Sequence, residues 1–416
     1  MATPPAEVAV HYVQRGSVPR QRHTQHRAPD GSLYAEELFG VEGFVGRSSL
    51  LYHLVPPTQT HQVEGVRDIT LDPVDHPLHR HRLVNTAGLE PRGDIVEGRV
   101  PLFFNRDVTF GVVRPERSMP EGRFYRNGEA DELLFVHEGS GRFDSVFGSM
   151  AYGPGDYIVI PIGTTWRLEP DASVAQRMLW LECPSELEPP KRYRNDYGQL
   201  LEHAPYSQRD IRLPEETAPH EETGEFVVEV KIRGRITAYH YRRHPFDVVG
   251  WDGYLYPWIF NIGDFQPITG RVHQPPPVHQ TFQARNFVVC SFVPRKFDYH
   301  PLAIPAPYNH SNINSDEVIY YVAGNFMSRR GVEISSFTLH PAGIPHGPHP
   351  GTVEASIGKE ATEELAVMVD TFNPLEVTQQ AAALDDERYP YSWLPAEAGS
   401  NEAQQLAERG PEAFPD

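Results

Sequence analysis

The chain has 416 residues, with 37 Lys and Arg against 56 Asp and Glu and a net charge of −19 at pH 7. This length predicts roughly two or three domains, and the acidic balance argues against a surface that coats nucleic acid or docks on anionic lipid. Proline, at 40 of 416 residues, is about twice as frequent as the ~5% average, which favours short strands and fixed turns over long helices.

The cysteine count limits the kinds of metal site. Only Cys183 and Cys290 are present, which predicts neither a disulfide framework nor a thiolate site. The chain has 20 histidines, so we expect any metal to be held by imidazole and carboxylate. No apolar run approaches the ~18 residues of a membrane span, and the N-terminus lacks a signal pattern. We therefore expect a cytoplasmic protein without a nucleic-acid or membrane partner.

Short apolar runs separated by glycine and proline follow one another along the chain. In the first half they are at 100–104, 108–113, 133–136, 143–146 and 157–160, and a second series runs from 287 to 369. Between the two series, the charged and proline-rich stretch 185–225 is expected to be a connecting arm, with strands resuming at 226–232. Strands this short and this evenly punctuated indicate β-sandwiches or small barrels.

A supersecondary pattern occurs twice. Its general form in cupin barrels is His-x-His, a Glu a few residues later, and then Pro-x-Gly-x-x-His. The two His alternate on one face of a strand, and turns bring the Glu and the last imidazole beside them. In the first copy the His-x-His positions hold Tyr125 and Asn127, Glu132 is present, and Trp166 replaces the last His. We expect this copy to bind no metal.

The second copy keeps the residues that a metal needs. It contains His310, a carboxylate and His346, with Tyr308 at the first His position. Because Asp316 and Glu317 are adjacent, this pattern leaves the carboxylate open by one place. Two imidazoles and one carboxylate are the set found in non-haem Fe(II) oxygenases, whereas the absence of thiolate weakens a structural zinc site.

These patterns predict a mainly β fold with two cupin-like β-sandwich or barrel domains, the first of them degenerate, and a short connecting arm. We place the N-terminal domain at 1–270 and the C-terminal, metal-binding domain at 271–395. Residues 396–416 are small and acidic, and we expect them to form a flexible tail.

Three segments of the second half are similar to motifs of the homogentisate 1,2-dioxygenase family. They are GWDGYLYPWIFN at 250–261, PYNHSN at 307–312 and SFTLHPAGIPHGP at 336–348. Their order and spacing also agree with the family, and the N-terminal stretches 20–27 and 33–43 fit it loosely. The resemblance spans about residues 10–390, and its specificity is concentrated in the second half.

The resemblance implies an Fe(II) enzyme that opens the ring of homogentisate with O2, in tyrosine and phenylalanine catabolism, and that forms a homo-oligomer (a trimer or hexamer). It implies His310, Glu317 and His346 as iron ligands, with the carboxylate at Glu317 favoured over Asp316 by loop counting. It also implies His340 as a group behind the ligands and His273 as the acid/base on the substrate side. His279 is the competing candidate for the acid/base role.

Departures from the family concern the substrate. Phe326 stands where the family carries a Tyr, Arg329 where it carries a Lys, and Asn309 where it carries a second Tyr after Tyr308. Arg329 or Arg330 is expected to hold a substrate carboxylate in a bidentate fork. The small aromatic acid is therefore open: gentisate is an alternative to homogentisate, and a non-catalytic metal-binding cupin or a metal isomerase remains a further alternative.

Overall fold

The computed structural model describes residues 11–270, 276–326, 328–329 and 331–394. The chain divides into two compact units, one of residues 1–72, 90–102 and 108–264 and the other of residues 73–89, 103–107 and 265–416. The predicted boundary at 270 places 73–89 and 103–107 in the N-terminal domain, whereas the structure assigns both to the second unit. The reason is long-range strand pairing: strand β5 (Arg82–Asn85) pairs with β24 (Ser336–His340). The expected flexible tail lies outside the described residues.

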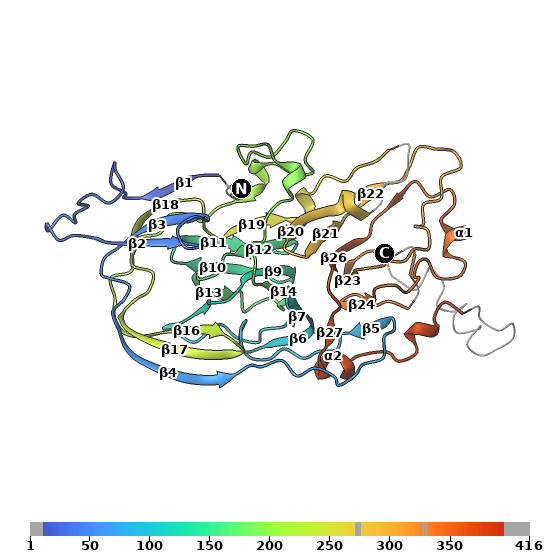
Figure 1. Ribbon diagram of the computed structural model, residues 1–416, viewed down its shortest axis with the longest axis horizontal. Helices are drawn as coiled ribbons and strands as arrows, with labels where there is room; N and C mark the ends of the chain where they lie inside the picture. Colours follow the sequence, from blue (N-terminus) through green and yellow to red (C-terminus); the bar gives the residue numbers. More distant parts are fainter. Residues whose placement is uncertain (1–10, 271–275, 327, 330, 395–416) are drawn as a thin grey trace. The chain divides into compact units, whose positions relative to one another are not determined.

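The first unit is built from three twisted sheets, whose strands are labelled in Figure 1. One sheet has the order β1 (Val13–Gly16), β18 (Val248–Gly253), β3 (Ser48–His53) and β2 (Ala35–Gly40). A second has the order β11 (Gly148–Tyr152), β10 (Gly141–Ser145), β13 (Thr165–Pro170), β8 (Arg123–Asn127), β16 (Thr223–Ile232), β17 (Arg235–Arg243) and β4 (Thr60–Asp68). The third runs through β15 (Ile211–Arg212), β19 (Trp258–Asn261), β12 (Asp156–Ile160), β9 (Asp131–Glu138), β14 (Arg177–Cys183), β7 (Thr109–Val113) and β6 (Arg99–Phe104).

The core of the first unit lies on these central strands. Strands β12 and β14 are buried along their whole length, and β9 over its first six residues. Their sequences are nearly continuous apolar runs, as expected of strands covered on both faces. One hydrophobic cluster gathers Leu134, Ile158 and Met178 with the aromatic rings of Phe143 and Trp166. The interior of this barrel is therefore filled largely by side chains.

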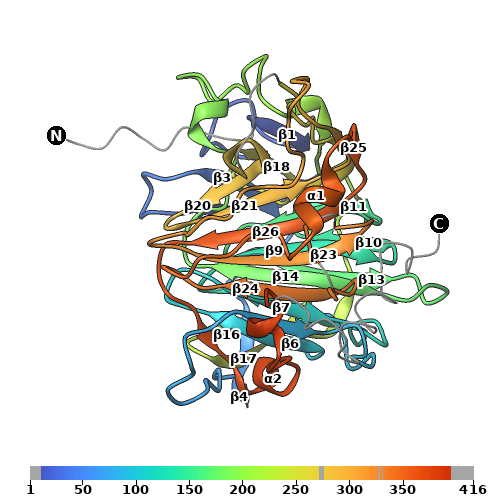
Figure 2. The same cartoon turned by 90° about the vertical axis from the view of Figure 1, so that its right-hand side faces the viewer.

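The second unit contains one antiparallel sheet of the order β20 (Gln280–Ala284), β21 (Phe287–Phe292), β26 (Leu365–Thr371), β23 (Asp316–Ala323), β24 and β5. Strands β20, β21, β26, β23 and β24 lie side by side in both views (Figure 2), and β5 pairs with β24. The remaining elements of this unit are short: β22 (Arg295–Lys296), β25 (Ala361–Thr362), β27 (Glu376–Val377), α1 (Thr352–Ser356), α2 (Gln379–Ala383), and 3-10 turns at Pro276–His279 and Tyr389–Tyr391.

Helical structure is thus confined to short pieces. Three further 3-10 turns, Lys191–Tyr193, Gln208–Asp210 and Ile262–Asp264, belong to the first unit. No helix among the described residues is long and apolar enough to cross a membrane. The structure confirms the predicted fold class, a mainly β chain with cupin-type barrels.

Candidate metal centre

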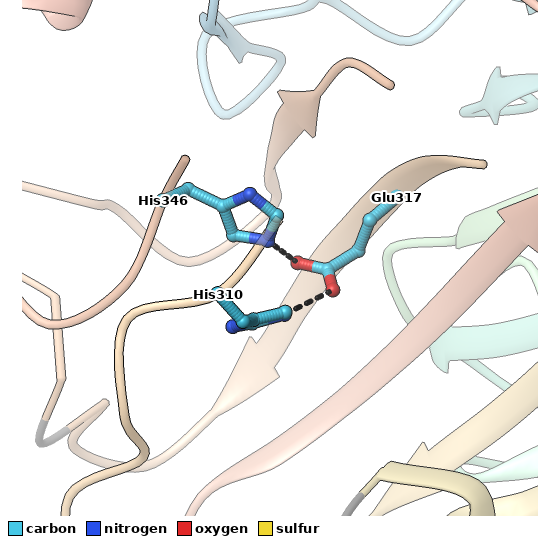
Figure 3. A group of neighbouring side chains, drawn as sticks. All are labelled: His310, Glu317 and His346. Carbon is cyan, nitrogen blue, oxygen red and sulfur yellow. Dashed lines mark ion pairs between the residues drawn. The ribbon is translucent and has the colours of Figure 1, made fainter. Parts of the chain in front are cut away.

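Strand β23 separates the two neighbouring carboxylates of the second cupin pattern. Successive strand residues point to opposite faces, so Asp316 and Glu317 face different surroundings. The Asp316 carboxylate accepts the backbone N–H groups of Ala342 and Leu375, each at 2.7 Å, and thereby ties two loops to the strand. Glu317 points instead toward the histidines (Figure 3). The structure therefore brings Glu317, and not Asp316, to the candidate centre.

The two candidate histidines are held together by a backbone bridge. The N–H of His310 donates to the carbonyl oxygen of His346, and the N–H of His346 donates to that of His310, both at 2.8 Å. Gly347 permits this approach, since a Cβ there would lie 2.2 Å from Oδ1 of Asn309. The proline-rich loops that precede the two histidines meet at this bridge, and the imidazoles therefore converge.

The three side chains form a compact donor group. Nε2 of His346 lies 3.5 Å from Oε1 of Glu317, and Nε2 of His310 lies 3.8 Å from Oε2. The ligand atoms of all three residues lie within 4.8 Å of one another. Nε2 of His346 is buried and has no hydrogen-bond partner. A buried imidazole nitrogen without a partner, aimed at a carboxylate, fits a bound metal ion, and this set of two nitrogens and one oxygen suits divalent iron.

His340 lies directly behind this group. Its Nδ1 is 2.8 Å from Oε1 of Glu317, and its ring stacks on that of His346 at 4.4 Å and 14°. Burial lowers the pKa of His340 to about 3, so its imidazole is neutral near pH 7. Burial alone would raise the pKa of Glu317, but the surrounding imidazoles of His310, His340 and His346 outweigh burial and hold that pKa well below its usual range. Glu317 is thus a charged acceptor, as a metal ligand must be.

A pocket of about 150 Å³ opens beside His310 and Glu317. Alternate residues of two neighbouring strands form part of its wall, because i and i+2 share a face: Glu317, Ile319 and Tyr321 from β23, and Ala366 and Met368 from β26. Phe292, Phe326, His279, Arg295 and Arg329 also line it. The pocket therefore combines apolar walls with the candidate centre and with side chains of both charges, since Glu364 also lines it and lies 2.6 Å from Arg295.

The remaining predicted site residues have different positions. His273 lies outside the described residues. His279 is buried, lines the pocket and packs on the ring of Phe292 at 4.6 Å. The ring of Tyr308 is 58% exposed, and its carbonyl oxygen lies 3.3 Å from Nδ1 of His310. Phe326 packs edge-on against Tyr321 at 4.5 Å.

Arg329 lies in the pocket wall, and its guanidinium donates to the carbonyl oxygen of Gly347. Nε of Arg329 is buried without a hydrogen-bond partner. No carboxylate among the described residues forms an ion pair with this guanidinium. Arg330, the alternative in the sequence, lies outside the described residues.

Several neighbours of the centre were not predicted from the sequence. Nδ2 of Asn312 is 3.3 Å from Oε2 of Glu317. Asp370 is the cross-strand partner of Glu317, and burial, reinforced by the charge of Glu317, raises its pKa well above the usual range. Tyr389 and Trp393 reach the centre from the C-terminal end of the described chain. Asn312 belongs to the PYNHSN motif, although no role was predicted for it, whereas the motif spacing contains no signal for Asp370, Tyr389 or Trp393, which strand pairing and packing bring into place.

The first barrel holds an arginine at the corresponding position. Nη1 of Arg99 lies 2.7 Å from Oε1 of Glu132, and the indole N–H of Trp166 donates to Oε2 at 3.2 Å. The guanidinium also lies over the rings of Tyr125 and Trp180, at 5.3 and 5.0 Å. Among the His, Cys, Asp and Glu side chains of the described residues, one group lies close enough together to hold a metal ion: His310, Glu317 and His346.

Of two cupin-type units, one has an ion pair and the other a candidate metal site beside a pocket, and together they define a protein of the cupin class. Comparison with known proteins identifies the family. The family model described as "Homogentisate 1,2-dioxygenase N-terminal" matches residues 9–262. A Saccharolobus solfataricus protein named "Putative dioxygenase" is 42% identical over 386 residues, which cover 92% of this chain and 99% of that protein. The chain belongs to the homogentisate 1,2-dioxygenase family, and the predicted resemblance is confirmed.

More distant relatives belong to the same family. Homogentisate 1,2-dioxygenase of Homo sapiens is 25% identical over 419 residues, which cover 91% of this chain and 92% of that enzyme. A solved structure, the "Cupin 2 conserved barrel domain protein" from Leptotrichia buccalis, covers 71% of this chain and 98% of its own at 10% identity and a TM-score of 0.33. Membership in a dioxygenase family supports an oxygenase enzyme.

Proposed function

We propose that this protein is an Fe(II)-dependent dioxygenase that opens the ring of homogentisate. The reaction adds both atoms of O2 to the substrate and gives maleylacetoacetate. One observation carries the proposal: His310, Glu317 and His346 converge, and the first two line a pocket together with Arg329. A metal centre beside a largely apolar pocket whose wall includes the Arg329 guanidinium suits a small aromatic acid.

The proposed ligands are His310, Glu317 and His346. When bound, iron supplies the coordination and redox chemistry that let O2 react with an electron-rich ring. The chain's own residues bind and orient the substrate. Apolar side chains such as Phe292, Ile319 and Met368 hold the ring.

Arg329 is proposed to hold the substrate's carboxylate. Its Nε is buried and unpartnered, and a guanidinium binds carboxylate through two parallel N–H bonds. An acidic protein offers an anion no attraction through its net charge of −19, so a local cation must provide it. We propose His273 as the base that takes a phenol proton, because imidazole titrates near neutral pH.

A related substrate is the alternative. Phe326 lines the pocket and lacks the hydroxyl of the Tyr that the family resemblance leads us to expect there. A polar group of homogentisate that relied on that hydroxyl would lose a partner, at a cost of about 1–3 kcal/mol. Gentisate, whose carboxylate is attached directly to the ring, is the second candidate for this reason.

Oxygen uptake tests the proposal. Purified protein reconstituted with Fe(II) should consume O2 with homogentisate and yield maleylacetoacetate, and His346→Ala should abolish both iron binding and uptake. Turnover of gentisate but not of homogentisate would make gentisate the substrate in place of homogentisate. If neither acid supports O2 uptake although iron is bound, a non-catalytic metal-binding cupin is favoured. Turnover of substrate without O2 would favour an isomerase.

Two further properties stay proposals. The family resemblance favours a homo-oligomer, a trimer or a hexamer, which light scattering of the purified protein measures directly. A cytoplasmic location is checked by cell fractionation.

A further inference from the structure

The segment from Tyr389 to Trp393 lies against the candidate centre from behind. Tyr389 is buried and begins a 3-10 turn, and Trp393 follows at its end. Their rings lie beside two histidines that are not candidate ligands: the ring centroids of Tyr389 and His340 are 6.5 Å apart, and those of Trp393 and His349 are 4.5 Å apart. Neither residue is a metal ligand, so their contacts act on the groups that hold the ligands.

Tyr389 contacts Glu317 through His340. The Tyr389 hydroxyl is 3.4 Å from Nε2 of His340, and Nδ1 of the same ring is 2.8 Å from Oε1 of Glu317. The imidazole of His340 thus lies between the Glu317 carboxylate and the Tyr389 hydroxyl and contacts both. In this way Tyr389 holds the orientation of the ring that contacts Glu317.

Trp393 contacts the loop that carries His346. Its indole N–H donates to the carbonyl oxygen of Gly347 at 3.0 Å, and the guanidinium of Arg329 donates to the same oxygen. The indole also stacks on His349 at 17°. The hydroxyl of Ser392 lies 2.7 Å from Nε2 of His349. The segment after His346 is thus held at the backbone of Gly347 and at the side chain of His349.

We propose that residues 389–393 form a latch for the metal centre, in which Tyr389 and Trp393 are positioning residues for Glu317 and His346. The inference rests on the proposed metal site, and it adds that ligand geometry depends on the C-terminal segment. Groups that orient metal ligands typically contribute 10–100-fold to metal affinity. Without the latch, the carboxylate and the His346 loop would have to be ordered by the ion itself.

The test uses the full chain and Co²⁺ as the probe. Tyr389→Phe removes one hydroxyl and Trp393→Phe removes one N–H, and each keeps an aromatic ring in place. Tyr391→Phe is the matched control, because Tyr391 belongs to the same turn and is 68% exposed. For each variant we would measure the Kd for Co²⁺ by chelator competition, the visible spectrum of bound Co²⁺, and the Tm of the metal-free protein.

The latch predicts that Tyr389→Phe and Trp393→Phe bind Co²⁺ about 10–100-fold more weakly and with an altered spectrum, whereas Tyr391→Phe matches the unchanged protein. Equal affinity and equal spectra in all three variants, with a lower Tm, would reduce the segment to a structural role and overturn the latch alone. Failure of the unchanged protein to bind Co²⁺ or Fe²⁺ would overturn the proposed metal site and the latch with it.

Discussion

Glu132 and Glu317 occupy equivalent positions in two copies of one barrel, yet Glu132 faces a guanidinium and Glu317 faces imidazoles. Each follows an Asp whose carboxylate accepts two backbone N–H groups from later loops: Ile162 and Leu187 for Asp131, and Ala342 and Leu375 for Asp316. The Asp therefore fixes the barrel in both copies, and the Glu faces its interior. In the first barrel, Arg99 supplies the positive charge that faces the Glu. In the second barrel, the equivalent position is the candidate metal site.

Arg99 and Glu132 should be strongly coupled in stability. Arg99→Met leaves the Glu132 carboxylate buried without its cation, which should lower the free energy of unfolding by about 3–5 kcal/mol. Glu132→Leu leaves Arg99 with only the carboxylate of Glu182, 3.9 Å away, and should also lower stability. The double variant removes both members of the pair and should lose clearly less than the sum. Urea unfolding of the four proteins gives the coupling. Additive losses would show that the pair is not a unit, and the metal content should be the same in all variants that fold.

The two carboxylates of β23 should respond oppositely to loss of charge. Glu317→Gln removes the charged oxygen donor and should lose iron, which a metal assay after dialysis detects. Asp316→Asn keeps that donor but leaves one of two backbone N–H groups without an acceptor, so it should retain iron and lose about 1–3 kcal/mol of stability. Iron retained in the first variant and lost in the second would reverse our assignment.

The sequence predicts part of this site. The spacing predicts His310 and His346 as candidate ligands and leaves the carboxylate open between Asp316 and Glu317, and the family resemblance then favours Glu317. The replacement of His by Trp166 in the first copy likewise marked it as degenerate. Local spacing contains no sign of Arg99 or Trp393, since each reaches its site through contacts between distant parts of the chain. The same limit applies to residues 73–89, whose strand joins the second unit by pairing with β24.

His273 and His279 should differ in what their loss does. If His273 takes the phenol proton, His273→Ala should keep its iron and lose about 10²–10⁴ of its turnover rate. His279→Ala removes the same side chain from a residue that lines the pocket, and it should raise KM more than it lowers kcat. Steady-state kinetics with parallel iron analysis distinguish the two. The opposite pattern would make His279 the base, and loss of iron from His273→Ala would make His273 a ligand.

His53 should give the first unit a stability that depends on pH. Its Nδ1 is 2.7 Å from Asp247 and its Nε2 is 2.9 Å from Glu37. Burial opposes protonation, but these two carboxylates overcome it and raise the pKa of His53 from 6.5 to about 9. Because folding favours the charged ring, its contribution is complete below pH ~6.5 and disappears as pH rises through about 9.

This rise in pKa corresponds to about 3 kcal/mol of unfolding free energy. Urea unfolding from pH 6 to pH 10, for the unchanged protein and for His53→Gln, measures the contribution as the difference between the two curves. The difference should be largest at pH 6 and should shrink steadily to pH 9.5, because the lost term belongs to the protonated ring alone. A difference that stays constant over this range would mean that His53 is neutral in the folded protein and that its two carboxylate contacts are ordinary hydrogen bonds.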